Sequence, residues 1–266
     1  MKKRYSICYN PKIENSIEVM ENLKRILVSN SVDFDVLDID NLKSGYDFAF
    51  IIGGDGTILK AARFFAEFKT PIFGINLGRL GFLSQATVDN LDCAITSVLN
   101  EDFKIEKRMM LECGENNALN DFVVKGSSSS RTSRFALEIN GKFVCEYLAD
   151  GIIISTPTGS TAYGMAAGGP VLAPEVEAIT IIPICPHTFS ARPIVVSSDD
   201  EIKILPCKNN EYRVSADGQI AFSTDSELLV KKSSNKAYLA LLKDNDFYSV
   251  LRNKLNWGYS PAKCQD

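Results

Sequence analysis

Short apolar runs alternate with segments of helical periodicity over the first hundred residues. The run at residues 48–52 (FAFII) is apolar at every position, which is typical of a strand buried on both faces of a sheet. The predicted strands cover residues 4–9, 34–39, 48–52 and 72–75, and the predicted helices cover residues 15–29, 59–68 and 91–99. This alternation predicts an α/β domain with a parallel sheet and helices on both faces.

After about residue 103 the pattern changes to short tracts in which apolar and polar residues alternate. These tracts lie at residues 135–139, 143–147, 202–205, 212–216 and 228–232. The turn pairs Asn140-Gly141 and Asp217-Gly218 separate such tracts, and an Asn-Gly pair in this setting is a strong hairpin signal. We therefore expect an α/β domain at residues 1–100 and an all-β, antiparallel, sandwich-like domain at 101–244. A helix is expected at 246–255, with the tail 245–266 packing back on the first domain.

The amino-acid composition excludes several classes of protein. Of 266 residues, 45% are hydrophobic and 23% charged, which is typical of a globular fold and excludes a disordered or low-complexity chain. The net charge of −4 gives no general attraction to nucleic acid or anionic membranes, and no apolar run is long enough to cross a bilayer. Seven cysteines without a C-x-x-C pair, and a single histidine, His187, favour reduced thiols over a metal site. A cytoplasmic protein is expected.

A glycine-rich turn, GGDGT at residues 53–57, directly follows the apolar strand and precedes a predicted helix. Glycines let backbone amides converge on an anion, and a helix N-terminus adds positive potential. We therefore expect phosphate to bind at Gly53, Gly54, Gly56 and Thr57. Asp55 lies between glycines at the carboxyl end of a predicted parallel strand, where open α/β sheets place their ligands. The alternative is a tight turn in which Asp55 accepts local N–H bonds.

The GGDGT turn resembles the signature of NAD kinases, diacylglycerol and sphingosine kinases and, in variant form, phosphofructokinases. In those families the aspartate is the acid/base group beside the phosphoryl acceptor. This resemblance implies that Asp55 is catalytic, and it indicates a kinase superfamily without identifying the substrate.

Four further segments resemble the NAD kinase family in particular. They are NLGRLGFL at residues 76–83, LND at 119–121, the run from 150 to 170 (DGIIISTPTGSTAYGMAAGGP), and PICPHTFSARP at 183–193 followed by DGQ at 217–219. The resemblance extends from Gly53 to the tail and is to the bacterial type of the family. The sequence departs from the common pattern at Ala166, Leu148 and Phe189, where many relatives have a serine, a basic residue and a leucine.

The resemblance implies phosphoryl transfer from ATP or polyphosphate to the 2′-hydroxyl of the adenosine ribose of NAD, with Mg²⁺ or another divalent cation accompanying the donor. It also implies a homodimer or homotetramer. The residues expected to bind NAD are Asp55, Gly56, Lys60, Asn120, Asp121, Arg131, Asp150, Thr158, Thr161, Ala162, Tyr163, Ala166 and Gln219. Their chemistry suits a nucleoside, because an Asn amide pairs with an adenine edge and a Tyr ring packs on a base.

For several of these residues a plain structural role is an alternative. Lys60 is about equally well explained as a solvated lysine, and for Arg131 a surface arginine is the alternative. His187, which is not among the expected NAD-binding residues, is interpreted as a structural residue. At the level of the whole protein the alternatives are a lipid kinase of the diacylglycerol type and a non-catalytic NAD-binding regulator. The first is disfavoured by the lack of a basic amphipathic stretch. The second is disfavoured because a sensor needs no base beside the ribose.

Overall fold

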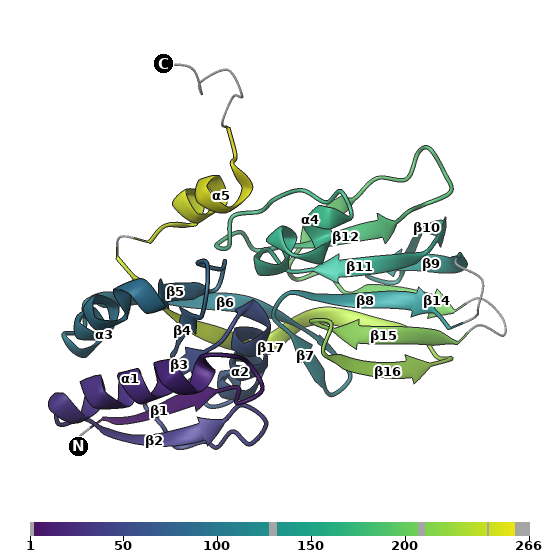
Figure 1. Ribbon diagram of the computed structural model, residues 1–266. Helices are drawn as coiled ribbons and strands as arrows, with labels where there is room; N and C mark the ends of the chain where they lie inside the picture. Colours follow the sequence, from purple (N-terminus) through teal and green to yellow (C-terminus); the bar gives the residue numbers. More distant parts are fainter. Residues whose placement is uncertain (1–2, 128–131, 207–210, 244, 259–266) are drawn as a thin grey trace, which may run out of the picture. The chain divides into compact units, whose positions relative to one another are not determined.

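The computed structural model describes residues 3–127, 132–206, 211–243 and 245–258. The chain forms two compact units (Figure 1). Unit 1 comprises Met1–Lys107 and Tyr238–Asp266, and unit 2 comprises Arg108–Ala237. Both boundaries fall inside strands, namely β6 (Phe103–Cys113) and β17 (Leu228–Leu242), so each of these strands contributes to both units.

Unit 1 contains a parallel sheet with the strand order β2-β1-β3-β4. Its elements are β1 (Arg4–Tyr9), α1 (Ser16–Ser29), β2 (Asp33–Asp38), β3 (Phe48–Ile52), α2 (Asp55–Ala66), β4 (Ile72–Asn76), β5 (Ser84–Thr87), a 3₁₀ turn η1 (Val88–Asn90), α3 (Leu91–Leu99) and α5 (Phe247–Leu255). Strand β5 also pairs with β4 in parallel, and Leu239 of β17 pairs with Ile72. The predicted parallel α/β architecture is confirmed.

Helices cover both faces of this sheet, as the alternation of side chains along β4 shows. Phe73 and Ile75 point into a core that they share with buried residues of α1 and α3. Gly74 points the other way, toward α2, and a Cβ atom there would lie 2.5 Å from Ile58 Cδ1. Gly74 therefore has no side chain because α2 approaches the sheet closely at this point.

Helix α2 begins at Asp55, four residues earlier than the sequence pattern predicted, and it ends at Ala66. Gly54 is extended (φ −74°, ψ 178°), and its carbonyl accepts hydrogen bonds from the amides of Thr57 and Ile58. The helix thus starts inside the glycine turn. Asp55 consequently lies in the first helical turn rather than in a loop.

Unit 2 is a sandwich of two antiparallel sheets. One has the order β13-β12-β11-β8-β15-β16, and within this unit the other has the order β10-β9-β14-β17, with β6 pairing with β17 and with β7. The remaining bounds are β7 (Asn116–Ala118), β8 (Asp121–Gly126), β9 (Ser133–Ile139), β10 (Lys142–Ala149), β11 (Gly151–Ser155), η2 (Thr158–Thr161), α4 (Tyr163–Ala166), β12 (Ala178–Ile184), β13 (Ile194–Ser197), β14 (Ile202–Pro206), β15 (Tyr212–Ala216) and β16 (Ile220–Thr224).

The inner faces of the two sheets share one hydrophobic core. It includes Phe122, Ile152, Ile154, Ile181 and Val214 from the first sheet, and Leu111, Phe135, Leu137, Ile202 and Val230 from the second. The rings of Phe135 and Tyr212 stack across the core at a centroid distance of 5.1 Å. The predicted antiparallel β domain is confirmed.

Both predicted hairpin turns are present. Asn140 and Gly141, with φ values of 51° and 72°, form a two-residue turn between β9 and β10. Asp217, Gly218 and Gln219 join β15 to β16, with φ values of 50° and 65° at Asp217 and Gly218. Two successive residues at positive φ match the right-handed twist of the flanking strands, which is why Asn-Gly and Asp-Gly pairs suit two-residue hairpins.

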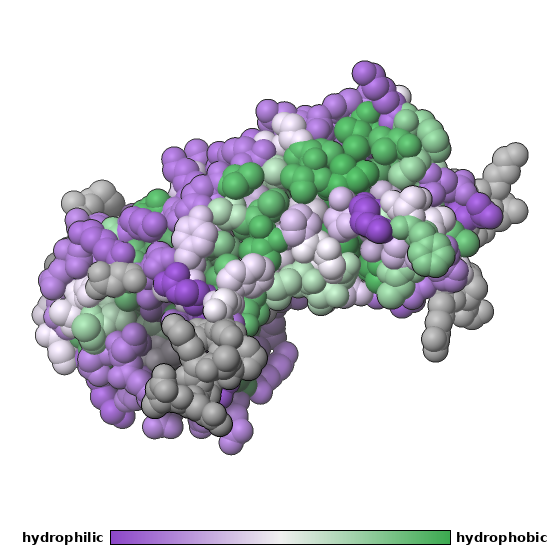
Figure 2. Space-filling view, turned by 90° about the horizontal axis from the view of Figure 1, so that it is seen from above, coloured by the Kyte–Doolittle hydropathy of each residue, from purple (hydrophilic) through white to green (hydrophobic). Residues whose placement is uncertain are grey.

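Unit 2 exposes several large hydrophobic side chains. Phe189 is fully exposed, and Val176 and Val195 are 44% and 48% exposed. Hydrophobic side chains gather into a continuous patch on the face of this unit that is visible in Figure 2. In the part of the chain that the structure describes, no helix has the length and hydropathy needed to cross a membrane.

Candidate active site

The glycine turn is shaped by close packing against the start of α2. Gly53 has φ +152°, and a Cβ atom there would lie 2.5 Å from Thr57 Oγ1. The amide of Gly53 donates to Ile75 O at 2.9 Å and that of Thr57 donates to Gly54 O at 2.9 Å. These two amides therefore already have partners within the protein, and the phosphate contacts expected of Gly53 and Thr57 stay predictions, as do those of Gly54 and Gly56.

The Asp55 carboxylate faces the loop that follows β4. Its Oδ2 accepts a hydrogen bond from the amide of Phe82 at 3.2 Å, and Oδ1 accepts a longer one from the amide of Leu83 at 3.4 Å. A Cβ atom on Gly81 would lie 2.0 Å from Oδ1, so the carboxylate in this orientation leaves no room for a side chain at this loop position. The side chain remains 32% exposed, which leaves part of the carboxylate open to a ligand.

A cation from the C-terminal helix also meets this carboxylate. Lys254 Nζ of α5 lies 3.5 Å from Asp55 Oδ2. Lys254 was not predicted from the sequence, because a lysine near the end of an amphipathic helix is usually an ordinary solvated residue. Only the fold brings the last helix to the glycine turn.

Lys60, expected to add charge near the glycine turn, forms an ion pair with Asp40 at 2.5 Å. Asp40 also pairs with Lys12 at 2.7 Å. Hydrogen bonds from the two ammonium groups lower the pKa of Asp40 to about 2. The role of Lys60 toward the dinucleotide stays a prediction.

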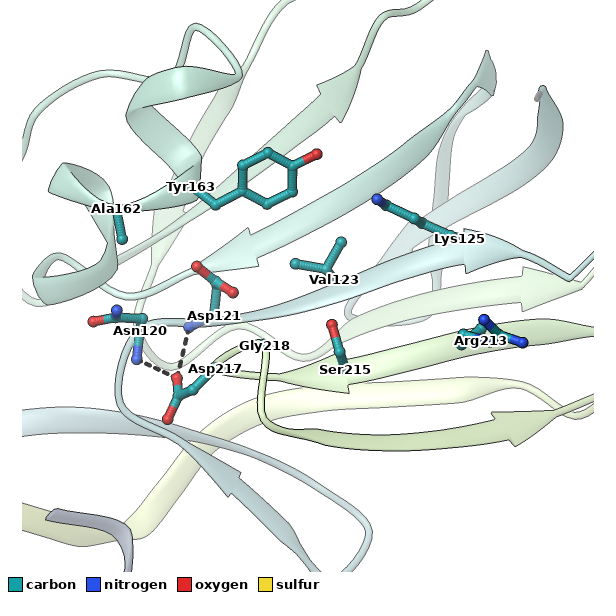
Figure 3. A pocket seen from close by; sticks show the side chains of 10 residues that line it. All are labelled: Asn120, Asp121, Val123, Lys125, Ala162, Tyr163, Arg213, Ser215, Asp217 and Gly218. Atoms are coloured by element: carbon teal, nitrogen blue, oxygen red, sulfur yellow. Dashed lines mark hydrogen bonds between the residues drawn. The ribbon is translucent and has the colours of Figure 1, made fainter. Parts of the chain in front are cut away.

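Unit 2 holds a cavity of about 520 Å³ on the face of its first sheet that points away from the sandwich core. Strands β8 and β15, the β15–β16 turn and the η2–α4 segment supply its lining (Figure 3). The lining residues are Asn120, Asp121, Val123, Lys125, Ala162, Tyr163, Arg213, Ser215, Asp217 and Gly218. Four of them, Asn120, Asp121, Ala162 and Tyr163, are among the residues expected to bind NAD. The volume is in the range usual for pockets that bind small molecules.

Asp217 fixes the Asn120–Asp121 end of this cavity. Its Oδ1 accepts from the amides of Asn120 at 2.7 Å and Asp121 at 3.3 Å (Figure 3). Its Oδ2 accepts from the amide of Leu119 at 3.1 Å. The other side of this loop packs against Gly159, where a Cβ atom would lie 2.1 Å from Asn120 O. This role of Asp217 was not predicted from the sequence, although the Asp-Gly pair did predict the turn in which it lies.

Asp121 is a buried carboxylic acid, 4% exposed, at the wall of the cavity. Burial and, to a smaller extent, the nearby Asp217 carboxylate together raise the pKa of Asp121 to about 7. Near neutral pH this side chain is therefore able to donate a hydrogen bond when protonated and to accept when ionised.

Tyr163 opens helix α4 and presents its ring at the cavity. The side chain is 39% exposed, and Lys125 Nζ lies 5.7 Å from the ring centroid (Figure 3). A partly exposed aromatic ring beside a cation is suited to a nucleobase or to another planar group.

The hydroxyl groups of the η2 segment serve the protein itself. Thr158 is 8% exposed and accepts from Arg108 Nη1 at 3.3 Å, and Thr161 Oγ1 donates to Thr158 O at 3.3 Å. Ser160 Oγ donates to Pro157 O and accepts from Leu172 N, so it joins η2 to the segment around Leu172. The predicted contacts of Thr158 and Thr161 with a base stay predictions.

The remaining predicted residues are not in the described lining of this cavity. Asp150 is half-buried, and its amide donates a hydrogen bond to Ile184 O at 2.9 Å. Ala166 is the last residue of α4. The amide of Gln219 donates to Ala216 O within the hairpin turn. Arg131 lies outside the described residues. Among the described residues, no group of three or more His, Cys, Asp or Glu side chains is arranged to hold a metal ion.

Comparisons with known proteins cover nearly the whole chain. The sequence models described as the ATP-NAD kinase N-terminal and C-terminal domains match residues 36–103 and 119–242. An NAD kinase of Thermoanaerobacter sp. (strain X514) is 37% identical, with 95% of this chain and 99% of the relative covered. An NAD kinase of Azotobacter vinelandii (strain DJ / ATCC BAA-1303) is 42% identical over 80% of this chain and 76% of the relative.

Two solved structures resemble the fold. An NAD kinase from Archaeoglobus fulgidus in complex with ATP has a TM-score of 0.80 and 28% identity, covering 95% of this chain and 98% of that one. Yeast NADH kinase complexed with NADH has a TM-score of 0.85 and 25% identity, covering 97% of this chain and 89% of that one.

Proposed function

Because this chain belongs to the NAD kinase family, we propose that it transfers a phosphoryl group from ATP or polyphosphate to the 2′-hydroxyl of the adenosine ribose of NAD, forming NADP. The observation that carries the proposed chemistry is the placement of Asp55. Its carboxylate is oriented by the amides of Phe82 and Leu83, and part of it stays exposed.

Asp55 is the proposed general base. It accepts the proton of the 2′-hydroxyl as that oxygen attacks the terminal phosphorus, and the bond from phosphorus to the rest of the donor breaks. A base of this kind contributes roughly 10²–10⁴ in rate. A carboxylate already held by two backbone amides needs little reorganisation when the reaction begins.

The adenosine part of NAD is proposed to bind in the unit 2 cavity. Tyr163 would stack on the base, and Asn120 and Asp121 would bond its polar edge or the ribose. The support is that Asp217 and Gly159 hold the Asn120–Asp121 loop in one conformation. A preformed loop binds a ligand without the cost of ordering it.

A divalent cation is proposed to enter with the phosphoryl donor. The described residues offer single carboxylates such as Asp55 rather than a cluster of acids. Magnesium commonly binds through substrate phosphates with only one or two protein carboxylates, so these residues fit that mode. Bound there, the cation would neutralise charge on the donor phosphates.

A homo-oligomer is proposed from the exposed hydrophobic residues of unit 2. A fully exposed phenylalanine, Phe189, is unusual for an isolated surface, and Val195 is 48% exposed. In such an assembly Asp150 would serve NAD bound by a neighbouring subunit. Sedimentation analysis of the wild type and of Phe189→Ser tests this, since a monomeric wild type contradicts it.

The decisive experiment is a coupled assay of NADP formation with pure protein, NAD, Mg²⁺ and either ATP or polyphosphate. Asp55→Asn should reduce kcat by roughly 10²–10⁴ and leave NAD affinity nearly intact. Asp92→Asn, at an exposed position of α3, is the matched control and should behave as wild type.

Each alternative has its own outcome in this assay. A wild type that forms no NADP with either donor but phosphorylates diacylglycerol is a lipid kinase. A wild type that binds NAD without turnover is a regulator. Near-normal turnover by Asp55→Asn would remove the base assignment while leaving the overall reaction in place.

A further inference from the structure

Unit 1 contains a second cavity, of about 450 Å³, between the loop after β4 and helix α5. The residues that line it are Arg79, Leu80, Asn245, Ser249, Val250, Asn253 and Lys254. Two of these are cationic, three are uncharged polar residues, and the described lining includes no acid. The cavity is therefore suited to an anion that carries more than one negative charge.

Helix α5 forms one wall of this cavity and is fixed by specific contacts. The Asp246 carboxylate accepts from the amides of Tyr248 at 2.8 Å and Ser249 at 2.9 Å, which caps the helix N-terminus. Asn245 Nδ2 donates to Gln85 O at 3.1 Å, and Leu251 is buried. The wall is thus part of the folded unit rather than a loose tail.

Lys254 connects this cavity to the proposed base. Its ammonium lies 4.9 Å from the centroid of the Phe82 ring and 3.5 Å from Asp55 Oδ2. Two contacts from separate elements thus aim the cation toward the glycine turn, while its side chain is still 37% exposed. An ion pair this exposed contributes little to the stability of the fold. The main effect of these two contacts is therefore to position the Lys254 ammonium.

Arg79 supplies the second charge from the opposite wall. It forms no ion pair with any other residue that the structure describes, and it is exposed. An arginine fork is matched in geometry to phosphate oxygens, and a lysine acts as a compact point charge.

In the proposed reaction the transferred phosphoryl group lies close to both Asp55 and Lys254. A base within about 3 Å of the 2′-hydroxyl, and an attack distance of about 3–3.5 Å, put the transferred phosphorus within about 7 Å of the Asp55 carboxylate. Lys254 Nζ, 3.5 Å from that carboxylate, lies within this small volume. Stabilising the charge of the transferred group is the main task of a protein in phosphoryl transfer.

We propose that the cavity between the 77–82 loop and α5 receives the phosphate chain of the phosphoryl donor, with Lys254 facing the transferred phosphoryl group and Arg79 contacting the phosphates behind it. This inference rests on the proposed function for the identity of the donor. The shared chemistry is a chain of phosphates, supplied either by ATP or by inorganic polyphosphate.

The first test measures binding without turnover. Isothermal titration of the full-length protein with inorganic tripolyphosphate compares wild type with Lys254→Met, Arg79→Met and Lys254→Arg. Each methionine variant should weaken binding by roughly tenfold or more, and Lys254→Arg should recover most of the loss. Arg252→Met, which removes an exposed cation from the same helix outside the cavity lining, should remain within about twofold of wild type.

The second test uses steady-state kinetics. Lys254→Met should lower kcat/KM for the donor by roughly 10–100-fold while KM for NAD changes less than about twofold. A merely structural role would instead lower the melting temperature and affect both substrates alike. A loss confined to one donor supports the proposal for that donor, and a loss with both supports a common site for ATP and polyphosphate.

The proposal is overturned if Lys254→Met and Arg79→Met bind tripolyphosphate as tightly as Arg252→Met does, or if the wild type does not bind it. Should Lys254→Met fail to fold, Arg79→Met decides, because Arg79 belongs to the loop and not to α5. A wild type that binds tripolyphosphate but forms no NADP contradicts the proposed function and leaves the anion cavity standing. Normal NADP formation by both methionine variants would contradict the proposed role of the cavity in binding the donor and would leave the proposed function unaffected.

Discussion

Asp217 Oδ1 lies 2.7 Å from the backbone nitrogen of Asn120, a residue 97 positions earlier in the chain. The same carboxylate also accepts from the amides of Leu119 and Asp121, so one side chain binds three consecutive backbone donors. The loop that forms one end of the unit 2 cavity is thereby fixed to the β15–β16 hairpin. This arrangement is a carboxylate holding a ligand-binding loop, and it makes Asp217 a positioning residue.

Replacing Asp217 with asparagine should loosen this loop. An amide offers one oxygen in place of two and turns its NH₂ group toward a backbone N–H, so at least one donor loses its partner. Hydrogen bonds to a charged group contribute about 1.5–3 kcal/mol each, and we expect the free energy of unfolding to fall by about 1–3 kcal/mol. The KM for NAD should rise more than kcat falls.

Urea denaturation and steady-state kinetics check this prediction. Asp225→Asn, in an exposed turn of the same unit, is the control and should change neither quantity appreciably. An Asp217→Asn variant with wild-type stability and wild-type KM for NAD would show that the loop does not depend on these hydrogen bonds.

Gly81→Ala should impair the proposed catalytic base directly. The new Cβ would lie 2.0 Å from Asp55 Oδ1, so the carboxylate has to rotate away from the Phe82 and Leu83 amides. We expect kcat to fall by roughly 10²-fold or more, because small displacements of a reacting group cost that much. Gly78→Ala is the matched control, since a Cβ there meets nothing within 4 Å. Equal activity of the two variants would argue against a fixed Asp55.

The sequence predicted the order of strands and helices in unit 1 because each strand there is a compact apolar run. The start of α2 was predicted four residues too late. Asp55, Gly56 and Thr57 lack the apolar periodicity of a helix, and glycine is a poor helix former. The extended Gly54 peptide begins the helix all the same, and this difference decides where the Asp55 side chain points.

Contacts between residues far apart in the sequence could not be predicted from the pattern of apolar and polar positions. Strand β17 was predicted only at residues 228–232, since its middle is a polar run, yet it continues to Leu242 because it pairs with strands of both units. The Asp217-Gly218 turn was predicted as a hairpin, but its amide partners at residues 119–121 are far away in sequence. Lys254 reaches Asp55 across nearly 200 positions for the same reason.

The raised pKa of Asp121 predicts a specific pH dependence of stability. In the folded protein its carboxyl stays protonated up to about pH 7, whereas in the unfolded chain it ionises near 3.8. Between these values the folded state holds more protons, so this group makes the free energy of unfolding fall as pH rises, by up to about 1.4 kcal/mol per pH unit. Above pH 7 and below pH 4 its contribution should be flat.

Asp121→Asn isolates this effect, because an amide has nearly the same shape and does not ionise. Urea denaturation of both proteins from pH 4 to pH 8 should show the stability of the variant rising relative to wild type up to about pH 7. Parallel curves over the whole range would mean that Asp121 does not titrate with a raised pKa.

Variants of Tyr163 distinguish the contribution of its ring to NAD binding from that of its hydroxyl. If the ring stacks on the adenine of NAD, Tyr163→Leu should weaken NAD binding by roughly tenfold, since stacking on an aromatic side chain contributes about 1–3 kcal/mol per base. Tyr163→Phe keeps the ring and its approach to Lys125 Nζ, 5.7 Å away, and should remain within about twofold of wild type. Because the side chain is 39% exposed, neither variant should shift the melting temperature much. Titration of NAD into the three proteins measures the effect, and unchanged binding by Tyr163→Leu would place the base elsewhere.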